Sequence, residues 1–217
     1  MISFSNVYKR YPNGFEALKN IVFTINQGEM VFITGNSGAG KSTLLKLIGA
    51  IERPTTGGII VNDQNVSKLK NSAIPFLRRN LGMVFQGQKI LFDRSVFDNV
   101  VLPLQICGFE HRSATGRVRA ALDKVGLLGK EKALPITLSG GERQRLCIAR
   151  AVVNRPSILI ADEPAAYLDP GYTKDIMSMF ESFNQVGVTV LITTPGIELL
   201  EGSQHRILSL SHGELVT

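Results

Sequence analysis

Several features that assign a chain to a particular class are missing or scarce in these 217 residues. There is no tryptophan, which argues against an aromatic stacking platform for nucleic acid. No run of about 18 apolar residues occurs, so we expect no membrane-spanning helix. The first residues, MISFSNVYKRYP, lack a basic region followed by an apolar core, which argues against a secretory signal peptide. Neither a low-complexity tract nor a repeat of fixed period is found, which excludes solenoid and fibrous architectures.

Cysteine is scarce as well. The two cysteines, Cys107 and Cys147, are far apart in the sequence and show no metal-ligand spacing. We expect both to be buried free thiols, as is typical of a protein in a reducing cytosol.

Positive charge is in modest excess, because 24 Lys and Arg against 18 Asp and Glu give a net charge of +6. The basic residues are spread along the chain, and aromatic residues do not alternate with them. A stacking platform for nucleic acid needs clustered basic and aromatic residues. We therefore expect no nucleic acid as a partner, and interpret the charge as a solvated surface with some attraction to an acidic membrane face.

The apolar pattern alternates between strand and helix periods. Strand character is found in residues 2–34 (short strands with turns at 12–14 and 26–28), 58–66, 81–86, 157–161, 188–193 and 206–216. Helical character is found in residues 41–51, from about 88 to 155, and in 172–185. Strands that alternate with helices predict an α/β fold with a mainly parallel sheet, interrupted by a helical insertion.

The strongest motif is GNSGAGKST, residues 35–43, which follows a predicted buried strand and opens a predicted helix. Its glycines let successive backbone N–H groups turn toward one anion, and the helix N-terminus adds its dipole. The Lys41 ammonium adds a charge for the β- and γ-phosphates of a nucleotide, and Ser42 offers a hydroxyl to Mg²⁺. A chance glycine-rich turn is the alternative, and the flanking strand and helix argue against it.

A pair of carboxylates, Asp162 and Glu163, ends the apolar run SILIADEP. In a parallel sheet, ligands bind at the carboxyl ends of the strands. There Asp162 can hold Mg²⁺ through its water shell, and Glu163 can orient or deprotonate an attacking water. Alone, such a pair is more often the start of a helix. Together with the phosphate loop it indicates nucleotide hydrolysis.

The segment TLSGGERQRLCIARA, residues 137–151, combines a helix start with two glycines. Ser139 is the predicted N-cap, and Glu142 follows three residues later as in a capping box. Each glycine in the first turn costs about 1 kcal/mol relative to alanine. Such a cost is explained if bare N–H groups must approach a phosphate closely.

These three motifs, in this order and spacing, resemble those of the ABC-transporter ATPases, and the resemblance covers nearly the whole chain. Stretches between them, such as IERPTTGGI, PFLRRNLGMVFQ, DRSVFDNV, AALDKVGLL and FNQVGVTVLI, are most similar to the bacterial cell-division branch of that family. The resemblance implies a single ABC-type nucleotide-binding domain over residues 1–217. A RecA-like, mainly parallel core with an N-terminal antiparallel β subdomain would comprise residues 1–87 and 156–217, with a helical subdomain inserted at 88–155.

The resemblance also implies roles for individual residues. Glu163, Gln86 and Lys41 would be catalytic, Tyr11 would stack on the adenine of ATP, and Ser42, Gln86 and Asp162 would bind Mg²⁺. Without the resemblance, Tyr11 is ordinary hydrophobic filler before a turn and Gln86 a polar strand end. The residues that would contact ATP are Tyr11, Gly35, Asn36, Ser37, Gly38, Ala39, Gly40, Lys41, Ser42, Thr43 and Gln86 of one chain, and Ser139 and Gly141 of a second.

Partners follow from the same resemblance. Two copies would form a homodimer, head to tail, on ATP binding, with residues 166–169 running across the interface. The helical region around residues 88–155 would dock an integral membrane subunit, FtsX-like in the cell-division branch, at the cytoplasmic face of the bacterial inner membrane. Nucleotide-driven closure would then control cell-wall hydrolases at the septum.

Two positions depart from the family pattern. Ala165-Ala166-Tyr167 stands where relatives usually have Thr-Gly-Asn, and Pro195 stands where they have a histidine that hydrogen-bonds the γ-phosphate. Proline has no side-chain donor and no backbone N–H, and losing one preorganised donor costs on the order of 10²–10³ in rate. The three histidines, His111, His205 and His212, lie elsewhere in the sequence.

The departures leave two hypotheses open. In the first, the chain is a slow Mg²⁺-dependent ATPase, because Glu163, Lys41 and Gln86 are all present. In the second, it is a nucleotide-gated binding module that closes on ATP, holds a membrane partner in one state and hydrolyses negligibly. A third reading is the ATPase subunit of a solute or lipoprotein transporter.

Overall fold

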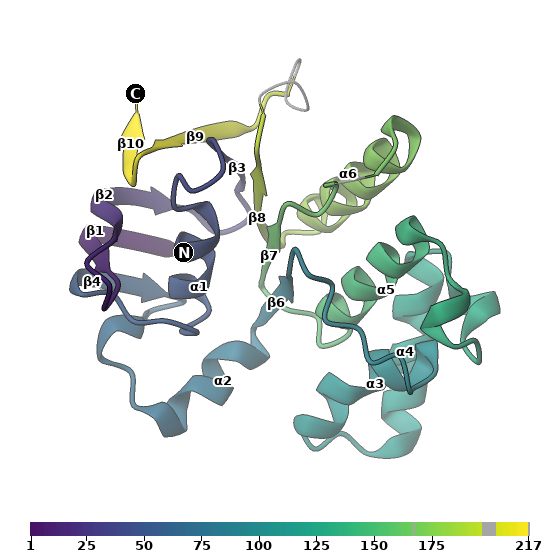
Figure 1. The fold of residues 1–217 in the computed structure, drawn as a ribbon. Coiled ribbons are helices and arrows are strands. Elements are labelled where there is room, and N and C mark those ends of the chain that lie inside the picture. Colours follow the sequence, from purple (N-terminus) through teal and green to yellow (C-terminus); the bar gives the residue numbers. More distant parts are fainter. Residues whose placement is uncertain (167, 197–202, 217) are drawn as a thin grey trace.

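The computed structural model describes residues 1–166, 168–196 and 203–216, which form two sheets and six α-helices (Figure 1). The antiparallel sheet has the strand order β2-β1-β4-β5, and the mainly parallel sheet has β10-β9-β3-β8-β7-β6. The strands are β1 Ile2–Arg10, β2 Glu16–Ile25, β3 Met30–Thr34, β4 Thr56–Val61, β5 Gln64–Asn65, β6 Leu81–Val84, β7 Ile158–Asp162, β8 Thr189–Thr194, β9 Arg206–Ser211 and β10 Glu214–Val216. The α-helices are α1 Lys41–Ile48, α2 Ile74–Arg79, α3 Val96–Ile106, α4 His111–Lys124, α5 Gly140–Val152 and α6 Pro170–Gln185.

The first two strands are longer than the sequence predicted. β1 has 9 residues and β2 has 10, whereas the pattern indicated several short strands. The register between them shifts near Asn6 and Asn20, and both asparagines have a φ of 48°. Such bulges interrupt the alternation of apolar and polar residues. The pattern therefore breaks although the strand continues.

The central strands of the parallel sheet are buried on both faces. Every residue of β3 and β8 is buried, as is typical of parallel strands covered on both sides. Alternate residues of β3 enter different cores, because successive side chains point to opposite faces. Phe32 belongs to the core formed with α3–α6, whereas Val31 and Ile33 belong to the core formed with α1 and the antiparallel sheet.

Helices α3, α4 and α5 pack against one another in the lobe at the lower right of Figure 1. The prediction of helix from about residue 88 was wrong for residues 88–95, which form an irregular segment with a turn at 92–94. Gln88 and Lys89 have positive φ angles of 54° and 49°, a conformation that a right-handed helix excludes. The Arg150 guanidinium of α5 donates to both of their carbonyl oxygens at 2.7 Å, so a contact distant in sequence keeps this segment out of the helix.

The two cysteines were expected to be buried free thiols. Both cysteines are free, as expected. Cys147 is buried, and this burial raises the pKa of its thiol to about 11. Cys107 is only half-buried, so the expectation of full burial is correct for one of the two.

The sequence predicts no membrane-spanning helix. Within residues 1–166, 168–196 and 203–216, none of the helices has the length and apolar character needed to cross a membrane.

Asn99, near the start of α3, holds the turn segment before that helix. Its side chain is completely buried. Its Oδ1 accepts the Leu91 N–H at 3.0 Å, and its Nδ2 donates to the carbonyl oxygens of Leu91, Arg94 and Ser95 at 2.9, 3.2 and 3.0 Å. Buried backbone groups are costly when they lose a partner.

We predict that Asn99→Ala lowers the free energy of unfolding by about 3 kcal/mol, because it removes four part-buried hydrogen bonds to the segment before α3 and leaves a cavity. Urea denaturation followed by far-UV circular dichroism measures this loss. Asn65→Ala is the control: its Oδ1 accepts one exposed N–H, from Lys68 at 3.2 Å, so we expect a loss of less than about 1 kcal/mol. Equal losses in the two variants would contradict the role given to Asn99.

Candidate functional site

Residues 35–40 join β3 to α1 in a loop that needs glycine at three points. Gly35, Gly38 and Gly40 have φ angles of 146°, 81° and 109°, a region that disfavours other residues. A Cβ on Gly35 would also clash with the carbonyl oxygen of Leu210 in β9. No side chain caps α1, so its first backbone N–H groups remain available to an anion.

Lys41, the first residue of α1, is 4% exposed. Its Nζ donates to the carbonyl oxygens of Gly35 at 2.6 Å and Asn36 at 3.2 Å. It also forms an ion pair with Glu163 Oε1 at 3.2 Å. This ion pair connects the phosphate loop to the carboxyl end of β7.

A hydroxyl that the sequence analysis missed holds the Asp162 carboxylate and the Glu163 backbone. Asp162 lies beside Thr193 of β8 in the sheet register. Thr193 Oγ1 donates to Asp162 Oδ1 at 2.8 Å and accepts the Glu163 N–H at 2.9 Å. Glu163 itself has a φ of 46°, so its backbone needs such support. The signal in the sequence was the threonine pair that ends the strand predicted at 188–193.

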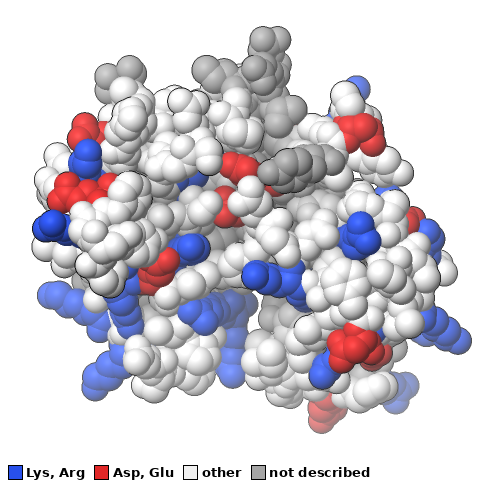
Figure 2. All heavy atoms as spheres, viewed as in Figure 1, with Lys and Arg blue, Asp and Glu red and all other residues white. Residues whose placement is uncertain are grey.

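Gln86 follows the edge strand β6, which pairs with β7. Its Nε2 donates to Glu163 Oε2 at 2.9 Å, so the carboxylate lies between the Gln86 amide and the Lys41 ammonium. All three residues line a cavity of about 480 Å³ with the rest of residues 37–43. Figure 2 shows acidic atoms in a hollow near the middle of this face, level with the ends of β7 and β8. The structure therefore brings together the three residues predicted to be catalytic.

The oxygen atoms at this cavity fit Mg²⁺. Ser42 lines the cavity. The Gln86 side chain donates to Glu163 from its amide nitrogen, so the Gln86 carbonyl oxygen is not used in that contact. Asp162 ends β7, but it is not among the residues that line the cavity, and its Oδ1 accepts the Thr193 hydroxyl at 2.8 Å. Mg²⁺ prefers oxygen ligands and is usually bound by one or two protein groups together with phosphate oxygens and water. Ser42 and Gln86 thus offer oxygen atoms at the cavity, and the Mg²⁺ roles of Ser42, Gln86 and Asp162 stay predictions.

Pro195 follows β8 and also lines the cavity. It places no hydrogen-bond donor there. All three histidines are among the described residues, and none of them lines the cavity. His111 begins α4, His205 has its ring centroid 6.0 Å from that of Phe32, and His212 lies between β9 and β10. The structure thus offers no replacement donor from these three side chains.

The predicted signature residues begin α5 in the helical lobe, and they do not line this cavity. Ser139 and Glu142 form the predicted capping box: the Ser139 Oγ accepts the Glu142 N–H at 3.2 Å, and the Glu142 carboxylate accepts the Ser139 N–H at 3.0 Å. A hydrogen bond from the Lys130 ammonium, at 2.5 Å, is the main reason why the pKa of Glu142 is lowered.

The two signature glycines differ in their surroundings. A Cβ on Gly140 would have no atom within 4 Å, so this side of the helix start is open. A Cβ on Gly141 would lie 2.7 Å from the Tyr172 ring of α6. Gly141 is therefore required by packing within the chain, through a residue that the sequence analysis did not single out. In the loop before α6, Ala166 lines the cavity, and Tyr167 lies outside the described residues.

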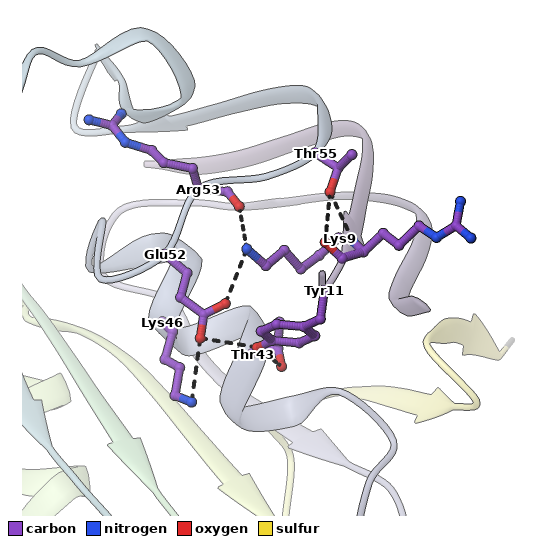
Figure 3. Close-up of polar contacts among 8 residues, drawn as sticks. Lys9, Tyr11, Thr43, Lys46, Glu52, Arg53 and Thr55 are labelled. Carbon is purple, nitrogen blue, oxygen red and sulfur yellow. Dashed lines mark hydrogen bonds and ion pairs between the residues drawn. The ribbon is translucent and has the colours of Figure 1, made fainter. Parts of the chain in front are cut away.

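Tyr11 follows β1 and does not line the cavity, whereas Phe15 does. The Tyr11 hydroxyl donates to Glu52 Oε1 at 3.0 Å and lies 3.3 Å from Thr43 Oγ1 (Figure 3). The sequence analysis did not predict a role for Phe15. Its side chain is 54% exposed and is therefore able to contact a ligand. The stacking role of Tyr11 stays a prediction.

Comparison with known proteins reveals close relatives. The chain is 53% identical over 215 residues to the cell division ATP-binding protein FtsE of Escherichia coli K12, covering 99% of this chain and 97% of that protein. It is 42% identical over 216 residues to FtsE of Bacillus subtilis, covering 100% and 95%. Both relatives match this chain from end to end.

Solved structures of similar fold are known as well. A dimeric ATP-binding cassette in a post-hydrolysis state, bound to ADP and Pi, has a TM-score of 0.91 and 33% identity, covering 100% of this chain and 97% of that one. CbiO1 of Clostridium perfringens, part of an ABC transporter complex, has a TM-score of 0.90 and 28% identity, covering 100% and 86%. These similarities confirm the predicted fold class, an antiparallel β subdomain with a mainly parallel sheet and helices.

A sequence profile of the ABC transporter family matches residues 18–166. The resemblance inferred from the phosphate loop, the signature and the carboxylate pair is thereby confirmed. The chain belongs to the ABC transporter family, as an ATP-binding cassette that is similar over its whole length to cell division ATP-binding proteins.

Proposed function

We propose that the chain is the ATP-binding subunit of a cell-division complex, and that it dimerises on ATP and hydrolyses it to drive a membrane partner. The observation that carries this proposal is the contact of Lys41 and Gln86 with Glu163 in one cavity beside the phosphate loop. A chain that only bound nucleotide would need the loop and Lys41. It would not need a carboxylate that accepts the Gln86 amide at the same place, on a backbone held by Thr193.

The Lys41–Glu163 ion pair suggests how binding prepares the site. A γ-phosphate would compete for the Lys41 ammonium, because charge-assisted hydrogen bonds to phosphate are strong. Glu163 would keep its contacts with Gln86, at 2.9 Å, and with Thr193 through its backbone N–H, at 2.9 Å. The carboxylate released from Lys41 would then be free to accept a hydrogen bond from water.

The proposed reaction transfers the γ-phosphoryl group to water. The water oxygen bonds to the γ-phosphorus, the bond to the β–γ bridging oxygen breaks with its electrons on ADP, and Glu163 accepts the water proton. Lys41 and the backbone N–H groups of the loop stabilise the charge that develops. Mg²⁺, held by Ser42, Gln86 and Asp162, would neutralise charge on the β- and γ-phosphate oxygens.

We infer that a second copy completes the site. Ser139 and Gly141 lie outside the cavity of their own chain, and the open side of Gly140 leaves the start of α5 accessible. A helix N-terminus is suited to a γ-phosphate. That the similar cassette bound to ADP and Pi is dimeric supports this inference.

The membrane partner we propose is an FtsX-like integral subunit, because the similarity to FtsE proteins extends over the whole chain. The helical region carries exposed apolar side chains that a partner can cover, among them Phe92, Ile106 and Ile136 at 50%, 71% and 68% exposure. Lys and Arg side chains gather at the lower edge of Figure 2, near α2, where acidic lipid would attract them. The chain would thus act at the cytoplasmic face of the inner membrane, in control of cell-wall hydrolysis at the septum.

Pro195 favours a second candidate function. A nucleotide-gated binding module would close on ATP and hold its partner, with negligible hydrolysis, because the cavity has no donor at this position. A lipoprotein or solute transporter would use the same cassette with a different membrane subunit.

We predict that the chain hydrolyses ATP with Mg²⁺ in single-turnover experiments. Glu163→Gln should lower the rate at least about 10²-fold by removing the proton acceptor, and Pro195→His should raise it about 10²-fold by adding a donor. Pro195→Ala is the matched control, and its rate should equal that of the parent. If the parent binds ATP but is as inactive as Glu163→Gln, while Pro195→His turns over, the binding module is the correct function.

A further prediction concerns the dimer. In a Glu163→Gln background, ATP should convert the chain to a dimer, as measured by size-exclusion chromatography with light scattering. Adding Ser139→Asp should abolish the dimer, since aspartate caps a helix as well as serine does but brings a negative charge to the γ-phosphate. Ser139→Asn, which caps equally well without the charge, should retain it. An ATP dimer that tolerates Ser139→Asp would show that α5 does not meet the partner's nucleotide.

A further inference from the structure

Glu52 is the centre of a polar cluster at the opposite end of α1 from the phosphate loop (Figure 3). Its Oε1 accepts the Tyr11 hydroxyl at 3.0 Å and lies 3.5 Å from the Lys46 ammonium. Its Oε2 lies 3.2 Å from the Lys9 ammonium. The Glu52 side chain is 21% exposed.

The backbone on both sides of the cluster is joined by hydrogen bonds. The Lys9 ammonium also donates to the Arg53 carbonyl at 2.9 Å. The Arg10 N–H donates to Thr55 Oγ1 at 2.8 Å, and the Thr55 N–H to the Tyr8 carbonyl at 2.8 Å. The segment that carries Glu52 is thus connected to the end of β1, directly before Tyr11. The carboxylate and the phenol are therefore held at a fixed separation.

The Tyr11 ring is oriented from two directions. Its hydroxyl lies between Glu52 Oε1 and, at 3.3 Å, the Thr43 hydroxyl of the phosphate-loop helix. The Lys9 ammonium lies 5.0 Å from the ring centroid, over one face. A base that stacks on Tyr11 therefore has the opposite face to use. Thr43 is a buried residue of α1. Its contact with the Tyr11 hydroxyl therefore connects the ring to the helix that follows the phosphate loop.

Glu52 is ionised at neutral pH. Burial raises the pKa of its carboxyl, but the hydrogen bonds from Tyr11 and Lys9 and the charges of Lys9 and Lys46 outweigh this and lower it. Burial, with the hydrogen bond to Glu52, raises the pKa of the Tyr11 phenol. The phenol therefore stays protonated and able to donate, and this contact persists over the neutral range. It weakens where the pH falls low enough to protonate Glu52, because the charge-assisted hydrogen bond then becomes a neutral one.

We propose that Glu52 is a positioning residue for recognition of the nucleotide base, because it fixes the Tyr11 ring through the hydroxyl. The proposal rests on the proposed binding of ATP and on the predicted stacking of Tyr11 on adenine. A ring that is already oriented loses little conformational freedom when the base binds. Glu52 touches neither base nor phosphate in this arrangement, so its effect is limited to the part of the affinity that depends on the base.

The test isolates the part of the affinity that depends on the base. It compares two ligands, ATP and inorganic tripolyphosphate, by isothermal titration calorimetry with Mg²⁺. We call the ratio of their affinities the base dependence. Glu52→Ala and Tyr11→Phe should each lower the base dependence about tenfold, the equivalent of one hydrogen bond to a charged group. The double variant should lower it no further than either single variant. Affinity for tripolyphosphate should be unchanged or higher, since Lys9 and Lys46 lose a neutralising charge.

Two variants isolate the hydrogen bond from the charge and from general damage. Glu52→Gln keeps an acceptor for the Tyr11 hydroxyl without the charge, so it should restore most of the base dependence. Glu131→Ala is the matched control, because the Glu131 carboxylate is 20% exposed and paired with Arg119 at 3.0 Å in the helical lobe. It should leave both affinities unchanged.

The proposal is overturned if Glu52→Ala weakens ATP and tripolyphosphate equally, or if its effect adds to that of Tyr11→Phe. A separate outcome concerns the proposed function. If Tyr11→Ala leaves the base dependence unchanged, Tyr11 is not the base contact, and both ideas fail. If Lys41→Ala binds both ligands as well as the parent, the phosphate loop is not the nucleotide site.

Discussion

The ion pair between Lys41 and Glu163 is the contact on which the rest of the site depends. It joins the N-terminus of α1 to the carboxyl end of β7, at 3.2 Å. The two ends can meet because β3, β8 and β7 are adjacent and parallel, so their carboxyl ends share one edge of the sheet. Lys41 is 4% exposed, and a buried ammonium without a counter-charge is strongly unfavourable. The loop, the sheet order and Glu163 are therefore interdependent.

Orientation of the Glu163 carboxylate is divided between two neighbouring strands. Gln86, after β6, holds Oε2, and Thr193 of β8 holds the backbone N–H. Pro195, directly after β8, contributes shape to the cavity but no donor. The contacts of Glu163 with Gln86 and Thr193 are therefore independent of the residue at position 195.

Helix α1 connects the phosphate loop to the polar cluster around Glu52. Lys41 stands at its N-terminus, Thr43 contacts the Tyr11 hydroxyl from its first turn, and Lys46 pairs with Glu52 beyond its C-terminus. Glu52 in turn receives the Tyr11 hydroxyl. A helix of 8 residues therefore fixes the distance between the phosphate loop and the aromatic ring. Changes in its packing would alter both ends together.

Features set by a few consecutive residues could be predicted: the phosphate loop, the capping box of Ser139, and the placement of Asp162 and Glu163 after a buried strand. Glycine φ angles, helix caps and apolar runs act locally, so the sequence by itself determined them. The turns before α3, and the contacts of Thr193, Tyr172 and Glu52, join residues far apart in the chain. Only the tertiary structure decided these, because sheet register and lobe packing determine which distant side chains meet.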